Sequence, residues 1–240
     1  MHIESFVKPT IVLLAGIDSE PYVGRFGRDS MTDQQCMEVL LDGVFNTNAF
    51  KLEGYFCDVC DWKGVACDAS NTVISVDWAI SPLLMGGTVS LDYMPAQVES
   101  FVMQRQSMHG SLPVHDLSMK LRKLNLIDNF FGGEICWPSL STLLEILLLD
   151  YNYFCGSIDL SQLPASLVSL GLSGNKFDGT IDITHLPSGL KRMYLSDNRL
   201  KQDFIEARNI PKDAECYIFT GNALGKVMYP DVVSENVLFF

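Results

Sequence analysis

The residues that could bind a metal or act as nucleophiles are concentrated near the N-terminus, where cysteines stand at Cys36, Cys57, Cys60 and Cys67. Cys57-x-x-Cys60 has a spacing common in structural zinc sites, and Cys67 and Cys36 could complete a set of four thiolate ligands. The same cysteines could form disulfides in an oxidising compartment, or remain reduced and buried in a reducing one. The spacing alone leaves all three alternatives open.

The rest of the sequence does not have the arrangement of a catalytic centre. The histidines beyond the N-terminus, His109, His115 and His185, are far apart and are expected in turns and return segments. No Gly-x-Ser-x-Gly, His-Glu-x-x-His or dinucleotide-binding motif is present. The remaining cysteines are scattered and are expected to act as small hydrophobic residues: Cys136, Cys155 and Cys216. We therefore predict a non-catalytic protein, with no catalytic residue and no cofactor.

The composition indicates a folded, acidic protein. Of the 240 residues, 48% are hydrophobic and 19% are charged, and the formal net charge is −12. This apolar content is sufficient for one continuous core. The negative charge disfavours nucleic-acid phosphates as a partner, because no basic cluster offsets it. No apolar run is long enough to span a membrane, and the longest candidate, residues 11–17, is expected to be a buried strand or helix.

A repeat organises most of the chain. Its clearest copy lies within residues 163–183 and reads Leu167, Leu170, Leu172, Asn175, Phe177, Gly179 and Ile181. The asparagine of this copy recurs 23 residues apart at Asn129, Asn152, Asn175 and Asn198. A fixed period of this length indicates a solenoid.

Weaker copies on both sides extend the repeat to about seven coils. Asn222 belongs to a copy with one extra residue, Gln106 replaces the asparagine upstream, and Val73 begins the first copy. A second marker, Leu-Pro or Leu-Ser, recurs with the same spacing, as at Leu163 and Leu186. The solenoid is therefore predicted to cover residues 71–225.

Within one coil, the pattern predicts a short strand followed by a turn. Leu170 and Leu172 alternate with Gly171, so the two leucines share the core face and the residues between them face out. Asn175 follows where the chain turns, and its amide can satisfy backbone groups that a tight bend leaves unpaired. Gly179 allows the returning segment to turn. Each coil can bury its apolar side chains only by stacking on its neighbours.

This pattern resembles the leucine-rich repeats over about residues 57–225. The Asn-x-Phe-x-Gly-x-Ile half is similar to the plant-type subclass, and the Leu-Pro-x-x-Leu half is similar to repeats of some bacterial and protist proteins. The resemblance implies an α/β repeat fold. It would be a curved leucine-rich-repeat solenoid with short parallel strands on its concave face and a helical cap at its N-terminus.

Residues 31–70 are expected to form that cap. A helix is predicted to begin near Met31, because Thr32 and Gln35 form a capping-box pair. The helix is expected to place Leu40 and Val44 on one face and to end at residues 46–48. Residues 1–30 would form an N-terminal extension, and the apolar residues 226–240 a C-terminal cap or tail.

The segment Cys60-x-Trp-x-Gly-Val-x-Cys67 resembles the N-terminal cap of plant-type leucine-rich repeats. That resemblance implies two disulfides, Cys36–Cys57 and Cys60–Cys67. Each would contribute about 2–4 kcal/mol to stability. Because the Trp-x-Gly-Val context already accounts for these cysteines, no metal site is predicted.

The outward strand positions form the candidate binding surface, because solenoids usually bind partners on the concave face. Apolar residues cluster there in the middle coils, as a protein interface requires. The predicted contact residues are Val102, Gln104, Lys123, Asn125, Ile127, Ile146, Leu148, Asp150, Arg192 and Tyr194. In the next coil, Ser169, Gly171 and Ser173 could admit a bulky ligand side chain or have no role in binding.

The sequence thus predicts a non-catalytic scaffold that binds a protein or peptide partner on its concave face. One alternative is a secreted or cell-surface recognition domain for a peptide or carbohydrate, with intact cap disulfides. A second alternative is an enzyme or metal protein with its site in residues 1–70. The chain has no N-glycosylation sequon and no clear signal-cleavage site, which favours an intracellular location and leaves secretion as the alternative.

Overall fold

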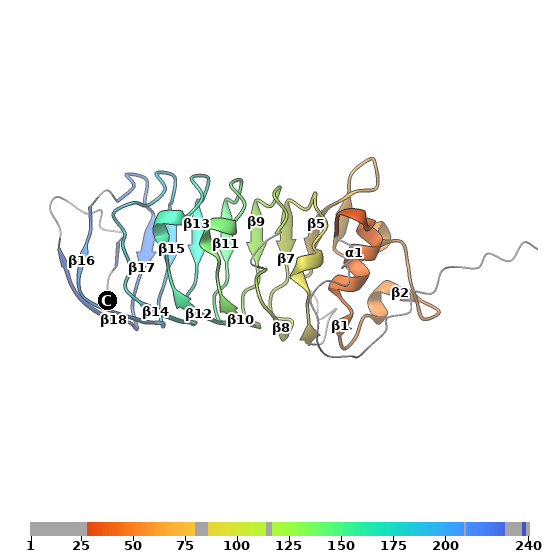
Figure 1. Cartoon of the computed structure of the whole chain (residues 1–240), viewed down its shortest axis with the longest axis horizontal. Coiled ribbons are helices and arrows are strands. Elements are labelled where there is room, and N and C mark those ends of the chain that lie inside the picture. Colours follow the sequence, from red (N-terminus) through yellow and green to blue (C-terminus); the bar gives the residue numbers. More distant parts are fainter. Residues whose placement is uncertain (1–27, 80–85, 114–116, 209, 229–236, 239–240) are drawn as a thin grey trace, which may run out of the picture.

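The computed structural model of the chain is a solenoid of stacked coils, with the helix α1 at its N-terminal end (Figure 1). It describes residues 28–79, 86–113, 117–208, 210–228 and 237–238. The predictions for residues 1–27, including the apolar run at 11–17, and for most of the C-terminal tail lie outside the described residues.

Seven parallel strands, one from each predicted coil, form the body of the first sheet among the described residues. They are β5 (Val73–Asp77), β7 (Ser100–Val102), β9 (Lys123–Asn125), β11 (Ile146–Leu148), β13 (Ser169–Gly171), β15 (Arg192–Tyr194) and β17 (Cys216–Ile218). Their register pairs residues one repeat apart, so that Leu147 lies between Leu124 and Leu170. The antiparallel β4 (Val65–Cys67) adds to one edge, and the parallel β19 (Val237–Leu238) adds to the other.

The returning segments form a second sheet, which the sequence analysis did not predict. Its strands are β1 (Gly43–Val44), β6 (Gly87–Thr88), β8 (Met108–Gly110), β10 (Phe130–Glu134), β12 (Tyr153–Ser157), β14 (Lys176–Gly179), β16 (Arg199–Glu206) and β18 (Ala223–Met228). All pair in parallel except β1 with β6. Some coils add a 3-10 turn between the sheets: η4 (Leu91–Tyr93), η5 (Trp137–Ser139) and η6 (Leu160–Gln162).

The core lies between the two sheets. Leu147 and Leu170 enter it from the first sheet, and Phe154 and Phe177 enter it from the second, all without accessible surface. The rings of Phe154 and Phe177 stack with centroids 6.4 Å apart. Each phenylalanine ring is therefore buried only when the neighbouring coil is stacked against it.

The repeated asparagines close each turn as the sequence analysis predicted. The Asn175 amide donates to the carbonyl oxygens of Leu172 in its own coil and Leu149 in the preceding one, at 3.0 and 2.9 Å. Its Oδ1 accepts the N–H of Phe154 at 3.0 Å. One buried side chain thus satisfies backbone groups of two coils, which would otherwise be unpaired in the core.

The helix α1 (Asp33–Leu40) begins with the predicted capping box between Thr32 and Gln35. It ends earlier than predicted, because Val44 lies in β1. Gly43 explains the difference: β1 passes so close to Thr88 that a side chain at Gly43 would meet the Thr88 carbonyl oxygen at 2.7 Å.

Aromatic rings join this N-terminal region to the first coil. Phe50 follows α1 in the turn η2 (Asn48–Phe50), and its ring lies 4.8 Å from Trp62 and 5.4 Å from Trp78. Trp78 in turn contacts Phe101 of β7, with centroids 6.0 Å apart. The short strands β2 (Lys51–Leu52) and β3 (Tyr55–Phe56) and the turn η3 (Val59–Asp61) complete this end.

One of the two implied disulfides is present. Cys60 and Cys67 are bonded, with Cα atoms 5.7 Å apart. Cys36 and Cys57 are free thiols, so the implied Cys36–Cys57 bond is absent. The Cys57 segment instead contacts α1 through Gln34, whose side-chain amide donates to the Cys57 carbonyl oxygen at 3.0 Å. Cys36 is buried, at 2% exposure.

Candidate binding surface

The predicted contact residues lie in or two residues after β7, β9, β11 and β15, strands of the first sheet that stack along the solenoid (Figure 1). We define the strand face as the outward residues of β5, β7, β9, β11, β13, β15 and β17, with the second residue after each strand. In β11 the middle residue Leu147 is buried, while Ile146 and Leu148 on either side are half-buried. In β11 the burial therefore follows the period-two alternation of a strand.

The predicted contact residues differ in how much surface they offer. Ile127, Ile146, Leu148 and Tyr194 are half-buried, as are Gln104, Lys123 and Arg192. Three others are buried: Val102, Asn125 and Asp150, at 3%, 8% and 9% exposure.

Val102 does not offer a contact surface, contrary to prediction. Its register partner Asn125 donates to Gln104 at 3.3 Å, and Gln104 is the next residue along the same side of the Val102 strand. These two polar side chains lie beside Val102, so the apolar centre of the strand face consists of Ile127, Ile146 and Leu148.

The coil that presents Gly171 is not an empty site for a ligand side chain. A Cβ atom at Gly171 would overlap the Asp150 carboxylate and would lie 3.0 Å from Leu148 Cδ2. Gly174 in the same coil is covered in a similar way, because the Tyr151 ring lies over it. Side chains of the preceding coil therefore fill the space beside both glycines.

Asp150 is the acidic residue of the strand face that this packing buries. Its Oδ1 accepts the N–H of Ser173 at 2.9 Å, and it forms no ion pair with any described residue. Burial raises the pKa of Asp150, and the hydrogen bonds from Ser173 oppose this shift. Burial also raises the pKa of Tyr194; Cys216 acts in the same direction and Arg192 opposes it.

Three basic residues near the start of the strands, Arg122, Lys191 and Arg192, are paired with glutamates. Arg192 Nη1 lies 2.7 Å from Glu215 Oε2, and Lys191 Nζ lies 3.6 Å from Glu215 Oε1. Arg122 and Glu145 form a similar pair at 2.6 Å. Alternation alone does not assign Glu145 and Glu215 to the face, because each stands one residue before an outward position.

A second surface carries exposed aromatic residues on the second sheet. His109, which was expected in a turn or return segment, lies in β8, and its ring centroid is 5.0 Å from that of Phe130. Phe130 stacks on Tyr153 at 5.8 Å, and Lys176 Nζ lies 4.3 Å from the centre of the Tyr153 ring. The Phe130 and Tyr153 rings are stacked and the His109 and Phe130 rings are tilted, and these contacts join neighbouring coils.

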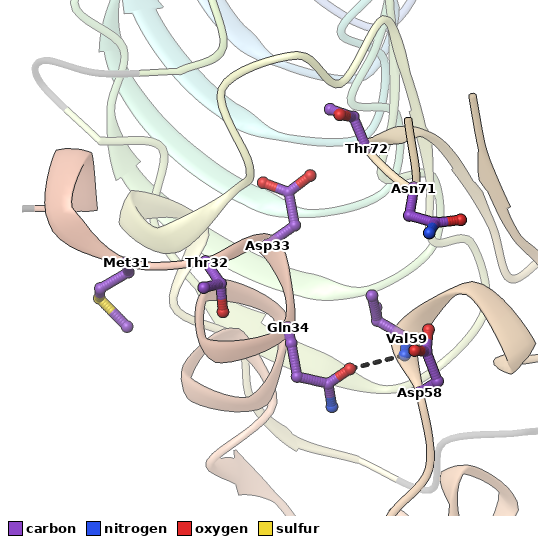
Figure 2. Close-up of a pocket in the computed structure, with 8 residues that line it drawn as sticks. All are labelled: Met31, Thr32, Asp33, Gln34, Asp58, Val59, Asn71 and Thr72. Atoms are coloured by element: carbon purple, nitrogen blue, oxygen red, sulfur yellow. Dashed lines mark hydrogen bonds between the residues drawn. The ribbon is translucent and has the colours of Figure 1, made fainter. Parts of the chain in front are cut away.

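A pocket of 340 Å³ lies between the start of α1 and the segments at residues 58–59 and 71–72 (Figure 2). Its polar side chains hold backbone groups. Gln34 points toward Val59 and accepts its N–H at 2.6 Å, and Asp33 Oδ2 accepts the N–H of Val73 at 2.8 Å. These hydrogen bonds hold the start of α1 against the segment before the first coil and against its strand β5.

The residues near the N-terminus do not assemble a metal site in the described structure. The Cys60–Cys67 disulfide uses two of the four sulfur atoms that the zinc alternative requires. No group of three or more His, Cys, Asp or Glu residues with metal-binding geometry occurs among the described residues.

Solved structures with the same architecture include plant receptor ectodomains. The leucine-rich-repeat ectodomain of the Arabidopsis receptor kinase HAESA, in complex with an extended IDA peptide hormone, matches with a TM-score of 0.63 at 23% identity. The match covers 80% of this chain and 33% of HAESA. The fold is a leucine-rich-repeat solenoid. This chain thus spans about a third of the HAESA structure.

Two further leucine-rich-repeat structures resemble this solenoid. PEPR1 in complex with AtPEP1 has a TM-score of 0.62 at 23% identity, with 80% of this chain and 32% of that chain covered. Pollen Receptor Kinase 3 has a TM-score of 0.58 at 22% identity, with 83% and 98% covered. No protein-family model and no curated protein matches the sequence. The described part of the solenoid contains no helix with the length and hydropathy of a membrane span.

Proposed function

We propose that this leucine-rich-repeat solenoid is a non-catalytic recognition module that binds a protein or peptide partner on its strand face, the face predicted to be concave. The observation that carries the proposal is the apolar centre formed by Ile127, Ile146 and Leu148. These side chains are half-buried, while charged residues stand at the edge of the same face. An apolar centre with a polar rim is the usual anatomy of a protein interface.

The similar structures support this choice of partner. HAESA was solved with a peptide hormone bound and PEPR1 in complex with AtPEP1, and both share the architecture of this chain. Because these similarities lie below 25% identity, the inference from them concerns the scaffold. The binding residues are proposed from the strand face of this chain itself.

The Cys60–Cys67 disulfide favours the alternative in which this module is secreted or displayed at a cell surface. Disulfides form and persist in oxidising compartments and are rare in the cytosol. This bond therefore opposes the intracellular location that the absence of a sequon favours.

The test is a pull-down that compares the wild type with Leu148→Glu and with the matched control Tyr153→Glu. Leu148 lies at the apolar centre, whereas Tyr153 is exposed on the second sheet. We expect Leu148→Glu to abolish recovery of a partner that both the wild type and Tyr153→Glu retain. Loss with Tyr153→Glu but not with Leu148→Glu would place the interface on the second sheet and reject the proposal. Circular dichroism of each variant confirms that it is folded.

A further inference from the structure

The last residue position of the strand face carries one acidic side chain. In coil order this position holds Ala79, Gln104, Ile127, Asp150, Ser173, Ser196 and Thr220. Six of the seven residues are neutral, and the exception, Asp150, lies next to the apolar centre. Asp150 is therefore the only charged residue at a position where the other six coils carry neutral side chains.

The structural role of Asp150 does not require that charge. Its Oδ1 accepts the N–H of Ser173, but a neutral amide oxygen can accept the same kind of bond. Asn125 shows this on the same face, where its Oδ1 accepts the N–H of Ile127 at 3.1 Å. Burying a carboxylate costs free energy unless it is paired with a cation. No cation among the described residues forms an ion pair with Asp150, whereas Arg122 and Arg192 are paired with Glu145 and Glu215.

The surroundings of Asp150 suit a long side chain with a charged end. Leu148, Gly171 and Tyr194 are consecutive in the register of β11, β13 and β15, and Asp150 fills the space above Gly171. A partner side chain that reaches Asp150 would lie between Leu148 and the Tyr194 ring. An aliphatic stem packs on leucine, and a cation is attracted to the face of a tyrosine ring.

We propose that Asp150 anchors a lysine or arginine side chain of a bound peptide segment, with Leu148 and Tyr194 packing against the stem of that side chain. This inference rests on the proposed function and specifies the chemistry of the partner. The charges are complementary, because the chain has a net charge of −12 and Asp150 has no cationic partner among the described residues. An apolar residue next to the basic one would contact Ile127, which lies beside Asp150 in the register of β9 and β11.

The probe is a phage-displayed library of random dodecapeptides, selected on the full chain at 0.3 M salt so that weak, non-specific attraction is screened. The affinity of a selected peptide is then measured for the wild type, Asp150→Asn, Leu148→Glu and Glu134→Gln. Glu134 is exposed on the second sheet, so Glu134→Gln is a matched control for the loss of one negative charge. The salt concentration of about 0.3 M shortens the range of interactions between exposed charges.

We expect selected peptides to share one basic position next to an apolar position. Asp150→Asn should weaken their binding at least tenfold, and Glu134→Gln should change it less than twofold. Replacing the basic peptide residue by glutamine should remove the difference between wild type and Asp150→Asn. This double-mutant comparison reports the contact itself rather than a general effect of charge.

Other outcomes overturn the inference. Loss of binding with Leu148→Glu but not with Asp150→Asn would reject the anchor and leave the proposed function intact. Binding that neither variant changes, or a library that yields no peptide, would count against both. Analytical ultracentrifugation of the chain alone tests for self-association. A dimer that Leu148→Glu disrupts and Asp150→Asn leaves unchanged would mean that the strand face binds a second copy of this chain.

Discussion

Asp150 illustrates how a single residue can lower stability where a partner is expected to bind. Because burial raises the pKa of Asp150, the folded state binds a proton more readily than the unfolded state. The ionised form therefore destabilises the fold, and this cost grows as the pH rises from the unfolded pKa, about 3.9, through the higher folded pKa. A bound cation would offset the cost at neutral pH.

We expect Asp150→Asn to be at least as stable as the wild type at pH 7. The variant keeps an oxygen that can accept the Ser173 N–H and removes the charge. Its advantage should shrink as the pH falls and disappear below about pH 4, where the aspartate is protonated in both states. Urea unfolding of both proteins between pH 3 and 8 measures the difference. A variant that is clearly less stable at pH 7 would show that the charge serves the fold.

At the residue scale, sequence reasoning could place Asp150 but not its environment. Alternation along one strand puts Leu148 and Asp150 on the outward side, and the structure agrees. Burial of Asp150 depends on Gly171 of the next coil, and Val102 is buried beside Asn125 of a neighbouring strand. Such contacts between coils follow from the register and from side-chain conformations, which the repeat pattern does not specify.

The asparagine turn is the element that links one coil to the next. Asn175→Ala should lower the free energy of unfolding by about 3 kcal/mol, because several buried backbone groups lose their partner at about 1–3 kcal/mol each. The matched control is Asp178→Asn, an exposed position three residues on, which should change stability by less than about 0.5 kcal/mol. Urea denaturation measures both. Equal stability of Asn175→Ala and the wild type would mean that water replaces the amide.

The two sheets were not equally predictable from the sequence. The first sheet follows from Leu-x-Leu alternation, which is a strong strand signal. The strands of the second sheet contain glycines, as in β10 (Phe130–Glu134) and β12 (Tyr153–Ser157), and glycine weakens a strand in isolation. They form because stacking aligns successive return segments at bonding distance. The sequence predicted the buried Phe154 but not the hydrogen bonding of the strand that carries it.

The cap makes a separate prediction about cysteine chemistry. Peptide mapping under non-reducing conditions should recover Cys60 linked to Cys67, with Cys36 and Cys57 alkylated as free thiols. Replacing Cys60 and Cys67 together by serine should lower the free energy of unfolding by about 2–3 kcal/mol, the expectation for so short a loop. A Cys36–Cys57 peptide would show that the second disulfide implied by the sequence resemblance forms in the protein. Alkylation of all seven cysteines would instead indicate that the protein resides in a reducing compartment.

At the scale of the whole molecule, stability should depend on where along the solenoid a turn is weakened. Each coil contacts mainly its neighbours, so stability is close to a sum of coil and interface contributions. Asn222 makes the same kind of bonds near the C-terminal end as Asn175 makes in the middle. It donates to Leu195 and Phe219 carbonyl oxygens and accepts the N–H of Leu200. The two residues therefore allow the same substitution to be compared at two positions.

We expect Asn222→Ala to increase amide hydrogen exchange mainly in β17 and β18, because an end coil can open while the rest stays stacked. Asn175→Ala should increase exchange in the coils on both sides of β13, since opening there removes two interfaces. Native-state hydrogen exchange with peptide-level mass spectrometry resolves these patterns. A uniform increase throughout the chain in both variants would mean that the solenoid unfolds only as a single unit. In that case the strand face could not adapt locally to a peptide, and partners would bind a preformed surface.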